Sequence, residues 1–185
     1  AGPLPDRWAD GVEVIEELAR APDAGLVATV GPRYFGFVTG GALPVTVAAE
    51  WLGTAWDQNG AMYVMSPAVA VLEDVVSAWL LEILHLPSAA SLGFVTGCHM
   101  ANFTCLAAAR HEVLRRAGWN VEADGLQQAP RVNVVVGDEV HVSVIGALRL
   151  LGIGANEVVR VPVDAQGRMR ADRLAQALEG LAGPL

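Results

Sequence analysis

Apolar runs alternate with helical segments after residue 90, and this alternation constrains the fold more than any other feature of the chain. Apolar segments at 92–95, 132–136 and 158–163 are separated by segments with helical spacing at 100–117 and 141–151. Strands that are apolar throughout and separated by helices are typical of a parallel sheet covered on both faces. We therefore predict an α/β fold with a parallel-rich sheet and helices on both faces.

The predicted sheet is short. It has about three strands, whereas about five or six are usual in a globular domain. Residues 180–185 have the composition of a connection to a further strand, so we expect the chain to be truncated at its carboxyl end. The turn formers at 164–167 separate the last predicted strand from a final helix at 171–181.

The first half of the chain is predicted to be helical. Apolar spacing indicates three helices, at 12–20, 44–57 and 67–85. Pro44 and Pro67 suit the first position of a helix, and Ser66 can cap the third helix. An irregular segment rich in Gly and Pro precedes Pro44. We therefore predict a helical arm with this segment at 1–43 and the amino-terminal part of the α/β domain at 44–185.

Charge and hydropathy exclude two classes of partner. The net charge is −8 without a basic cluster, which argues against nucleic acid. Acidic residues interrupt the richest apolar region before it reaches the roughly 18 residues of a membrane span, so we expect no membrane. Two cysteines do not form a disulfide framework, and we expect a reducing cytoplasmic location. With 53% hydrophobic residues, the chain is expected to have further protein partners.

The turn at 96–99 leads from an apolar segment into a helix that is expected to begin near Met100. Unpaired N–H groups at a helix amino terminus, together with the helix dipole, favour an anion. A phosphate would fit there without a lysine, and no lysine occurs in the chain. Many α/β proteins have a glycine turn at this place for geometric reasons alone, and from the residues themselves both interpretations stay open.

Three segments resemble, in order, the group II pyridoxal phosphate-dependent amino-acid decarboxylases of fold type I. Residues 93–110, GFVTGCHMANFTCLAAAR, resemble the family's phosphate turn, its Ala-Asn pair and the helix that ends Ala-Ala-Arg. Residues 137–143, GDEVHVS, are similar to its Asp-x-Ala-His-x-Ser segment. Residues 31–37, GPRYFGF, resemble a segment of its substrate pocket. The resemblance covers nearly the whole chain from residue 12 onward.

The resemblance implies the large domain of a fold type I enzyme, present in part, with pyridoxal 5′-phosphate as cofactor. The implied reaction is decarboxylation of an L-amino acid to the amine and carbon dioxide. His141 would stack on the cofactor ring as the catalytic residue of this chain. The residues implied around the phosphate are Gly97, Cys98 and His99. The residues implied near the substrate are Phe37 and Thr39.

The same resemblance implies partners for this chain. The family's Schiff-base lysine and the aspartate that pairs with the pyridine nitrogen lie past residue 185, so a carboxyl-terminal segment is expected to be missing and the chain alone to be inactive. The family's amino-terminal arm crosses to a second subunit, which implies a homodimer with residues 1–30 as the arm. Alternatives are an aldehyde-forming relative or other fold type I enzyme, and a non-catalytic half-protein that binds the cofactor weakly or only dimerises.

The candidate residues also have structural interpretations. His141 stands where a helix begins and could cap it. Cys105 is interpreted as an ordinary buried thiol. Cys98, His99, Cys105 and His141 are possible zinc ligands by type, but their spacing matches no compact zinc pattern and we expect no metal. The tryptophans predicted to lie in the core or at a subunit contact are Trp51, Trp56 and Trp79.

Overall fold

The computed structural model describes residues 6–20 and 23–184. Its internal contacts divide the chain into two units, one up to Ala90 and the other from Ser91. The second unit contains both strands and has a mixed α/β architecture. The predicted division into an arm at 1–43 and an α/β part at 44–185 stays a prediction.

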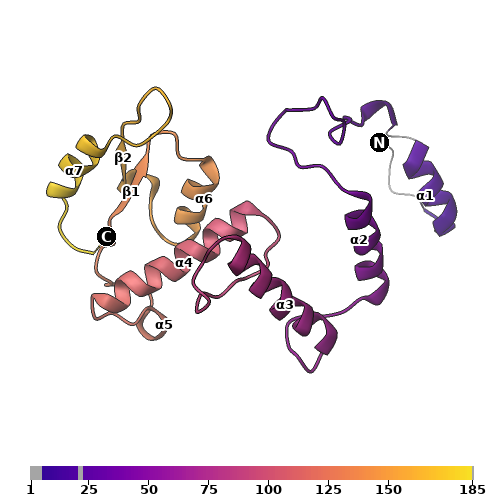
Figure 1. Ribbon diagram of the computed structural model, residues 1–185, viewed down its shortest axis with the longest axis horizontal. Helices are drawn as coiled ribbons and strands as arrows, with labels where there is room; N and C mark the ends of the chain where they lie inside the picture. The colour runs from indigo at the N-terminus through magenta and orange to yellow at the C-terminus, as the bar shows by residue number, and fades with distance from the viewer. Residues whose placement is uncertain (1–5, 21–22, 185) are drawn as a thin grey trace. The chain divides into compact units, whose positions relative to one another are not determined.

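The first unit contains the three helices expected from the sequence (Figure 1). They are α1 (Gly11–Arg20), α2 (Pro44–Trp56) and α3 (Pro67–Ile83), with a short 3-10 turn, η1 (Asp23–Gly25), after α1. A proline begins both α2 and α3, because its fixed φ suits the first turn and its missing N–H would have no partner there. Ser66 is the N-cap residue of α3, as predicted, but its buried hydroxyl makes no capping hydrogen bond and donates to Gln58 Oε1 at 3.0 Å instead.

None of the side chains of α1, α2 and α3 is buried. Trp51 is 72% exposed, and Trp56 and Trp79 are exposed as well. The interpretation of these tryptophans as core residues is therefore wrong for this chain. The other interpretation, a contact with another subunit, stays a prediction.

The second unit is built around a small parallel sheet of two strands. Strand β1 (Val134–Gly137) pairs with β2 (Val158–Val161), with Val134 opposite Val158 and Gly137 opposite Val161. Parallel neighbours need a crossover, and here it is made by α6 (Val142–Leu150) followed by the 3-10 turn η2 (Ala155–Glu157). The two predicted strands at 132–136 and 158–163 are thus confirmed in shorter form.

The third predicted strand, at 92–95, is wrong. These residues form no strand, and Phe94 in their middle is 51% exposed. An apolar run becomes a strand only where a neighbouring strand pairs with its backbone N–H and C=O groups. The apolar pattern of residues 92–95 does not show whether a strand that could pair with them lies within this chain.

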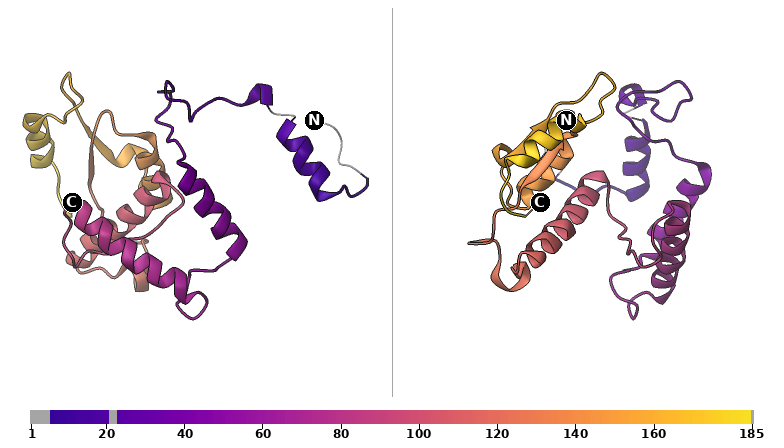
Figure 2. Two further views of the ribbon diagram at one scale, coloured as in Figure 1. Left: turned by 45° about the vertical axis from the view of Figure 1, so that its right-hand side comes forward. Right: turned by 60° about the vertical axis from the view of Figure 1, so that its left-hand side comes forward.

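The core of the second unit lies between the sheet and its helices. The buried apolar residues of the described chain are Leu114, Ala147, Leu148, Leu151, Val158 and Val161. Leu114 belongs to α4 (Cys98–Arg116), which packs on α6, while α7 (Ala171–Glu179) contacts β2. Figures 1 and 2 show the two strands between α6 on one side and α7 on the other. The four residues of β1 are nevertheless only half-buried, and helices on both faces of the sheet stay a prediction.

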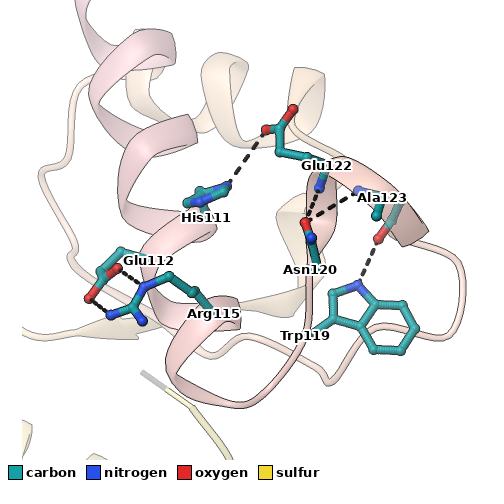
Figure 3. Close-up of polar contacts among 8 residues, drawn as sticks. His111, Glu112, Arg115, Trp119, Asn120, Glu122 and Ala123 are labelled. Atoms are coloured by element: carbon teal, nitrogen blue, oxygen red, sulfur yellow. Dashed lines mark hydrogen bonds and ion pairs between the residues drawn. The ribbon is translucent and has the colours of Figure 1, made fainter.

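A polar cluster joins the end of α4 to α5 (Val121–Asp124), a short helix that the sequence analysis missed (Figure 3). Asn120 Oδ1 accepts the N–H groups of Glu122 and Ala123, and Trp119 Nε1 donates to the Gly125 carbonyl at 2.8 Å. Beside them, hydrogen bonds from Arg115 and then Arg116 lower the pKa of Glu112 to about 2. These contacts serve the local fold.

The predicted turn at 164–167 is confirmed. The Asp164 carboxylate accepts the N–H groups of Gln166 and Arg168, and these bonds lower the pKa of that carboxyl. Val163 and Met169 then form an antiparallel bridge across the turn. Within the described residues, no helix is both long enough and apolar enough to cross a membrane.

Candidate functional site

Helix α4 begins at Cys98, two residues earlier than expected, and its cap residue is Gly97. Gly97 has φ +156° and ψ 179°, a backbone conformation that is essentially restricted to glycine. A glycine cap offers no side-chain acceptor to the N–H groups of the first turn. The start of α4 therefore presents backbone donors at the positive end of a helix dipole, an arrangement that suits an anion.

The His99 side chain turns toward α6. A Cβ atom built on Gly146 would stand 2.8 Å from His99 Cε1, so the imidazole packs closely against the α6 backbone at that glycine. Because the His99 ring lies against α6, the group that His99 offers to an anion at the start of α4 is its backbone N–H. A side chain at position 146 would require the His99 ring to move, so this glycine permits the close approach of the ring to α6.

His141 caps α6. Its backbone is extended, with φ −63° and ψ 142°, and its Nδ1 atom accepts the Ser143 N–H at 3.2 Å. Nδ1 also lies 2.8 Å from Ser143 Oγ. The capping role that the sequence left open is therefore present in the structure. The imidazole is otherwise exposed, and its stacking on a cofactor ring stays a prediction.

One hydrogen bond joins the beginnings of the two helices. Asn102 Nδ2, in the second turn of α4, donates to Ser143 Oγ, in the first turn of α6, at 2.9 Å. Both residues belong to the motifs noted in the sequence, but sequence reasoning gave neither a role. The available signal was Asn102 itself, a polar residue in an alanine-rich helix that packs against a neighbour.

The remaining candidate residues fall into different parts of the chain. Phe37 and Thr39 belong to the first unit, where Phe37 is exposed and has φ +56°. Their place near a substrate stays a prediction. In the second unit, the Asn102–Ser143 bond connects the helix that Gly97 caps with the helix that His141 caps.

The cysteines are both free and both exposed, so the interpretation of Cys105 as a buried thiol is wrong. Within the described ranges, no group of three or more His, Cys, Asp or Glu side chains is arranged to hold a metal ion. Farther along α4, Arg110 donates to the Leu151 carbonyl at the end of α6, at 2.6 Å. This bond supports the packing of the two helices.

Comparison with known proteins finds one family that matches most of the chain. Residues 4–182 match the family described as the pyridoxal-dependent decarboxylase conserved domain. Glutamate decarboxylase of Drosophila melanogaster is 26% identical over 176 residues, which are 95% of this chain and 33% of that protein. Aromatic-L-amino-acid decarboxylase of Bacillus atrophaeus is 26% identical over 178 residues, which are 95% of this chain and 34% of that protein. The chain thus spans about a third of the length of these curated relatives.

The fold has a close counterpart among solved structures. The glutamate decarboxylase domain of diaminobutyrate-pyruvate transaminase and L-2,4-diaminobutyrate decarboxylase from Vibrio parahaemolyticus matches with a TM-score of 0.89 at 23% identity. The match covers 97% of this chain and 39% of that one. The arrangement of helices and strands described here is therefore shared with part of a larger decarboxylase domain.

The backbone of Gly97 generates a testable prediction. Replacing Gly97 with Ala places a side chain at φ +156° and is expected to destabilise the protein by about 1–3 kcal/mol. Gly93→Ala is the matched control, because neither glycine has an atom within 4 Å of an added Cβ and Gly93 is not among the glycines of positive φ. That control should stay within about 0.5 kcal/mol of the parent. Urea unfolding of the complete protein measures both, and equal midpoints for the two variants would contradict the account.

Proposed function

Because the chain belongs to the family of pyridoxal-dependent decarboxylases, we propose that the complete protein converts an L-amino acid to the corresponding amine and carbon dioxide. Pyridoxal 5′-phosphate, when bound, supplies an electron sink for the pair that is released when the bond to the carboxylate breaks. The match of residues 4–182 of the 185-residue chain to this family is the observation that carries the proposal.

The start of α4 fits the phosphate end of this cofactor. The N–H groups of the first turn, at Cys98 and His99, would donate to the phosphate oxygens, and the helix dipole would add to the attraction. The space beside Gly97 is open, since an added Cβ would meet no atom within 4 Å. The donors are backbone groups, so the types of side chain at positions 98 and 99 matter less than the glycine cap.

His141 fits the role of a residue that lies against the cofactor ring. Two hydrogen-bond contacts hold the Nδ1 edge of the imidazole, and the residue is exposed. Through stacking, His141 would fix the plane of the cofactor relative to the bond to be broken, which is a contribution of orientation. It would orient the cofactor, while phosphate contacts would retain it.

The remainder of the site is proposed to come from outside this chain. No lysine occurs among the 185 residues, so the lysine that carries the cofactor and the aspartate that pairs with the pyridine nitrogen would lie in the rest of the protein. In that complete protein, residues 44–185 would be the amino-terminal part of the large domain of a fold type I enzyme. Phe37 and Thr39 would contribute to the substrate pocket.

A homodimer is proposed as the complete assembly. The support is the exposed apolar surface of α2 and α3, which includes Trp51, Trp56 and Trp79. Large exposed apolar patches are typical of surfaces that another protein surface covers. The amino-terminal residues 1–30 are proposed as an arm that reaches the second subunit.

The direct test of the function uses the complete protein, purified and supplied with pyridoxal 5′-phosphate. We expect the visible absorption of a lysine-bound cofactor and the release of amine from an L-amino acid. The 185-residue chain alone should release none, because it has no lysine. A complete protein that remains colourless and inactive with acidic, aromatic and aliphatic amino acids would refute the proposal.

The variant His141→Ala in the complete enzyme tests whether His141 orients the cofactor or mainly retains it. We expect kcat to fall by roughly 10- to 100-fold, because a misoriented reacting group loses rate, while cofactor affinity falls less. His111→Ala is the control, since the His111 ring faces Glu122 near the end of α4 (Figure 3). If His141→Ala and His111→Ala have the same kcat as the parent, the stacking role is wrong and only the cap remains.

The oligomeric state is tested by light scattering on the complete protein at micromolar concentration. We expect a stable dimer whose interface buries more than about 2,000 Å², the range of obligate assemblies. Replacing Trp51 and Trp79 with Gln should weaken the dimer if α2 and α3 lie at the interface. A monomer that retains full activity would contradict the proposed assembly.

A further inference from the structure

A chain of hydrogen bonds runs from Asn102 through Ser143 to His141. Asn102 Nδ2 lies 2.9 Å from Ser143 Oγ, and Ser143 Oγ lies 2.8 Å from His141 Nδ1. The backbone N–H of Ser143 also points to Nδ1, at 3.2 Å. Asn102 and Ser143 are both half-buried, whereas His141 is exposed. The chain therefore leads from the contact between α4 and α6 to the ring proposed to face the cofactor.

The donor and the acceptor of each hydrogen bond follow from the backbone N–H of Ser143, which can only donate. A backbone N–H can only donate, so the Nδ1 atom that it faces has a lone pair. A neutral imidazole with a lone pair on Nδ1 carries its proton on Nε2. The Ser143 hydroxyl must then donate to Nδ1, and its oxygen is left as an acceptor. The Asn102 amide satisfies that acceptor by donating from Nδ2.

The cap alone does not require this arrangement. A helix start needs one acceptor for the N–H, and Asn, Asp, Ser or Thr usually provides it. Asn120 does so at α5, where Oδ1 accepts two backbone N–H groups (Figure 3). At α6 the acceptor is instead an imidazole, and a second residue from another helix fixes the hydroxyl beside it. The Asn102 bond adds orientation that capping does not use.

We propose that Asn102, acting through Ser143, is a positioning residue that holds His141 as the tautomer with its proton on Nε2 and with its ring plane fixed. Its consequence for catalysis rests on the proposed function, since it assumes that the ring lies against the cofactor. With Nδ1 occupied, the only free polar atom of the ring is the Nε2–H donor. The hydrogen bonds and the tautomer themselves do not depend on the reaction.

The close contact of His99 with Gly146 supports this role. His99 and Asn102 are three residues apart on α4, and Ser143 and Gly146 are three apart on α6, so each pair lies on one face of its helix. The His99 ring packs on Gly146 one turn away from the Asn102–Ser143 bond, so the two helices are in close contact where Asn102 reaches Ser143. A short polar side chain could not span a wider gap.

The test replaces the donor with an acceptor of nearly the same shape. In the complete protein, Asn102→Asp puts a carboxylate opposite Ser143 Oγ, and the hydroxyl is expected to turn toward the carboxylate. His141 Nδ1 then loses the hydroxyl donor at 2.8 Å and keeps only the longer contact with the Ser143 N–H, at 3.2 Å. The Ser143 oxygen, whose proton now points to the carboxylate, is free to accept a hydrogen bond from a protonated Nδ1. We expect the fraction of His141 that is protonated on Nδ1 to rise, and kcat to fall by about tenfold or more with little change in cofactor affinity.

Asn120→Asp is the matched control. The side chain of Asn120 only accepts hydrogen bonds in the structure, and aspartate accepts them equally well. The same chemical change should therefore leave the His141 tautomer and the rate as they are in the parent. Ser143→Ala and Ser143→Thr form a second pair, in which only the threonine retains a hydroxyl and should retain the tautomer.

The primary measurement is nitrogen-15 NMR of the complete protein labelled at histidine, with His141 assigned by its absence in His141→Ala. Long-range coupling patterns distinguish a protonated ring nitrogen from one with a lone pair. A parent protein with the proton on Nδ1, or a tautomer that is the same in parent and Asn102→Asp, would overturn the inference. If circular dichroism shows that Asn102→Asp does not fold, the Ser143 variants decide. Loss of the Nε2-protonated tautomer in Ser143→Ala, together with its retention in Ser143→Thr, supports the inference. The same His141 tautomer in both variants overturns it.

The NMR result also separates this inference from the function. A parent tautomer on Nε2 that changes in Asn102→Asp, in a protein that releases no amine, would support the positioning role and refute the decarboxylase proposal. An active decarboxylase in which the His141 tautomer is the same in the parent and in Asn102→Asp would support the proposed function and refute the positioning role.

Discussion

The contact between α4 and α6 is the interaction on which the site depends. Gly146 lets the His99 ring lie directly on the α6 backbone, and Asn102 donates to Ser143 beside it. Buried Leu114 and Leu148, from the same two helices, belong to the core that supports this contact. Because the contact lies within the first two turns of both helices, it brings two helix beginnings close together.

The two beginnings are capped in different ways, and this difference gives each a distinct chemical capacity. Gly97 leaves the first N–H groups of α4 available to an anion, whereas His141 occupies the first turn of α6 with its own Nδ1. One helix start thus presents backbone donors that suit an anion, and the other presents an imidazole whose Nδ1 edge is held by hydrogen bonds. A cofactor with a phosphate at one end and an aromatic ring at the other suits this pair.

Local features could be predicted from the sequence where a residue's own conformational preference decides the outcome. Pro44, Pro67 and the Gly97 turn placed helix starts correctly or within two residues, and His141 marked the beginning of α6. Features that depend on partners distant in sequence could not be read. The run at 92–95 has strand composition without a strand beside it, and the Asn102–Ser143 bond joins residues 41 positions apart. The Ser66 hydroxyl likewise donates to Gln58, which lies outside α3, and makes no capping hydrogen bond.

The central claim is that the cofactor phosphate sits on the start of α4 while His141 lies against its ring. A crystal structure of the complete protein with bound pyridoxal 5′-phosphate measures this directly. The account predicts phosphate oxygens at about 2.7–3.1 Å from the backbone nitrogens of Cys98 and His99, in the range of charge-assisted hydrogen bonds. It also predicts the His141 ring parallel to the pyridine ring. A phosphate bound away from residues 97–100, or a His141 ring that does not contact the cofactor, would contradict it.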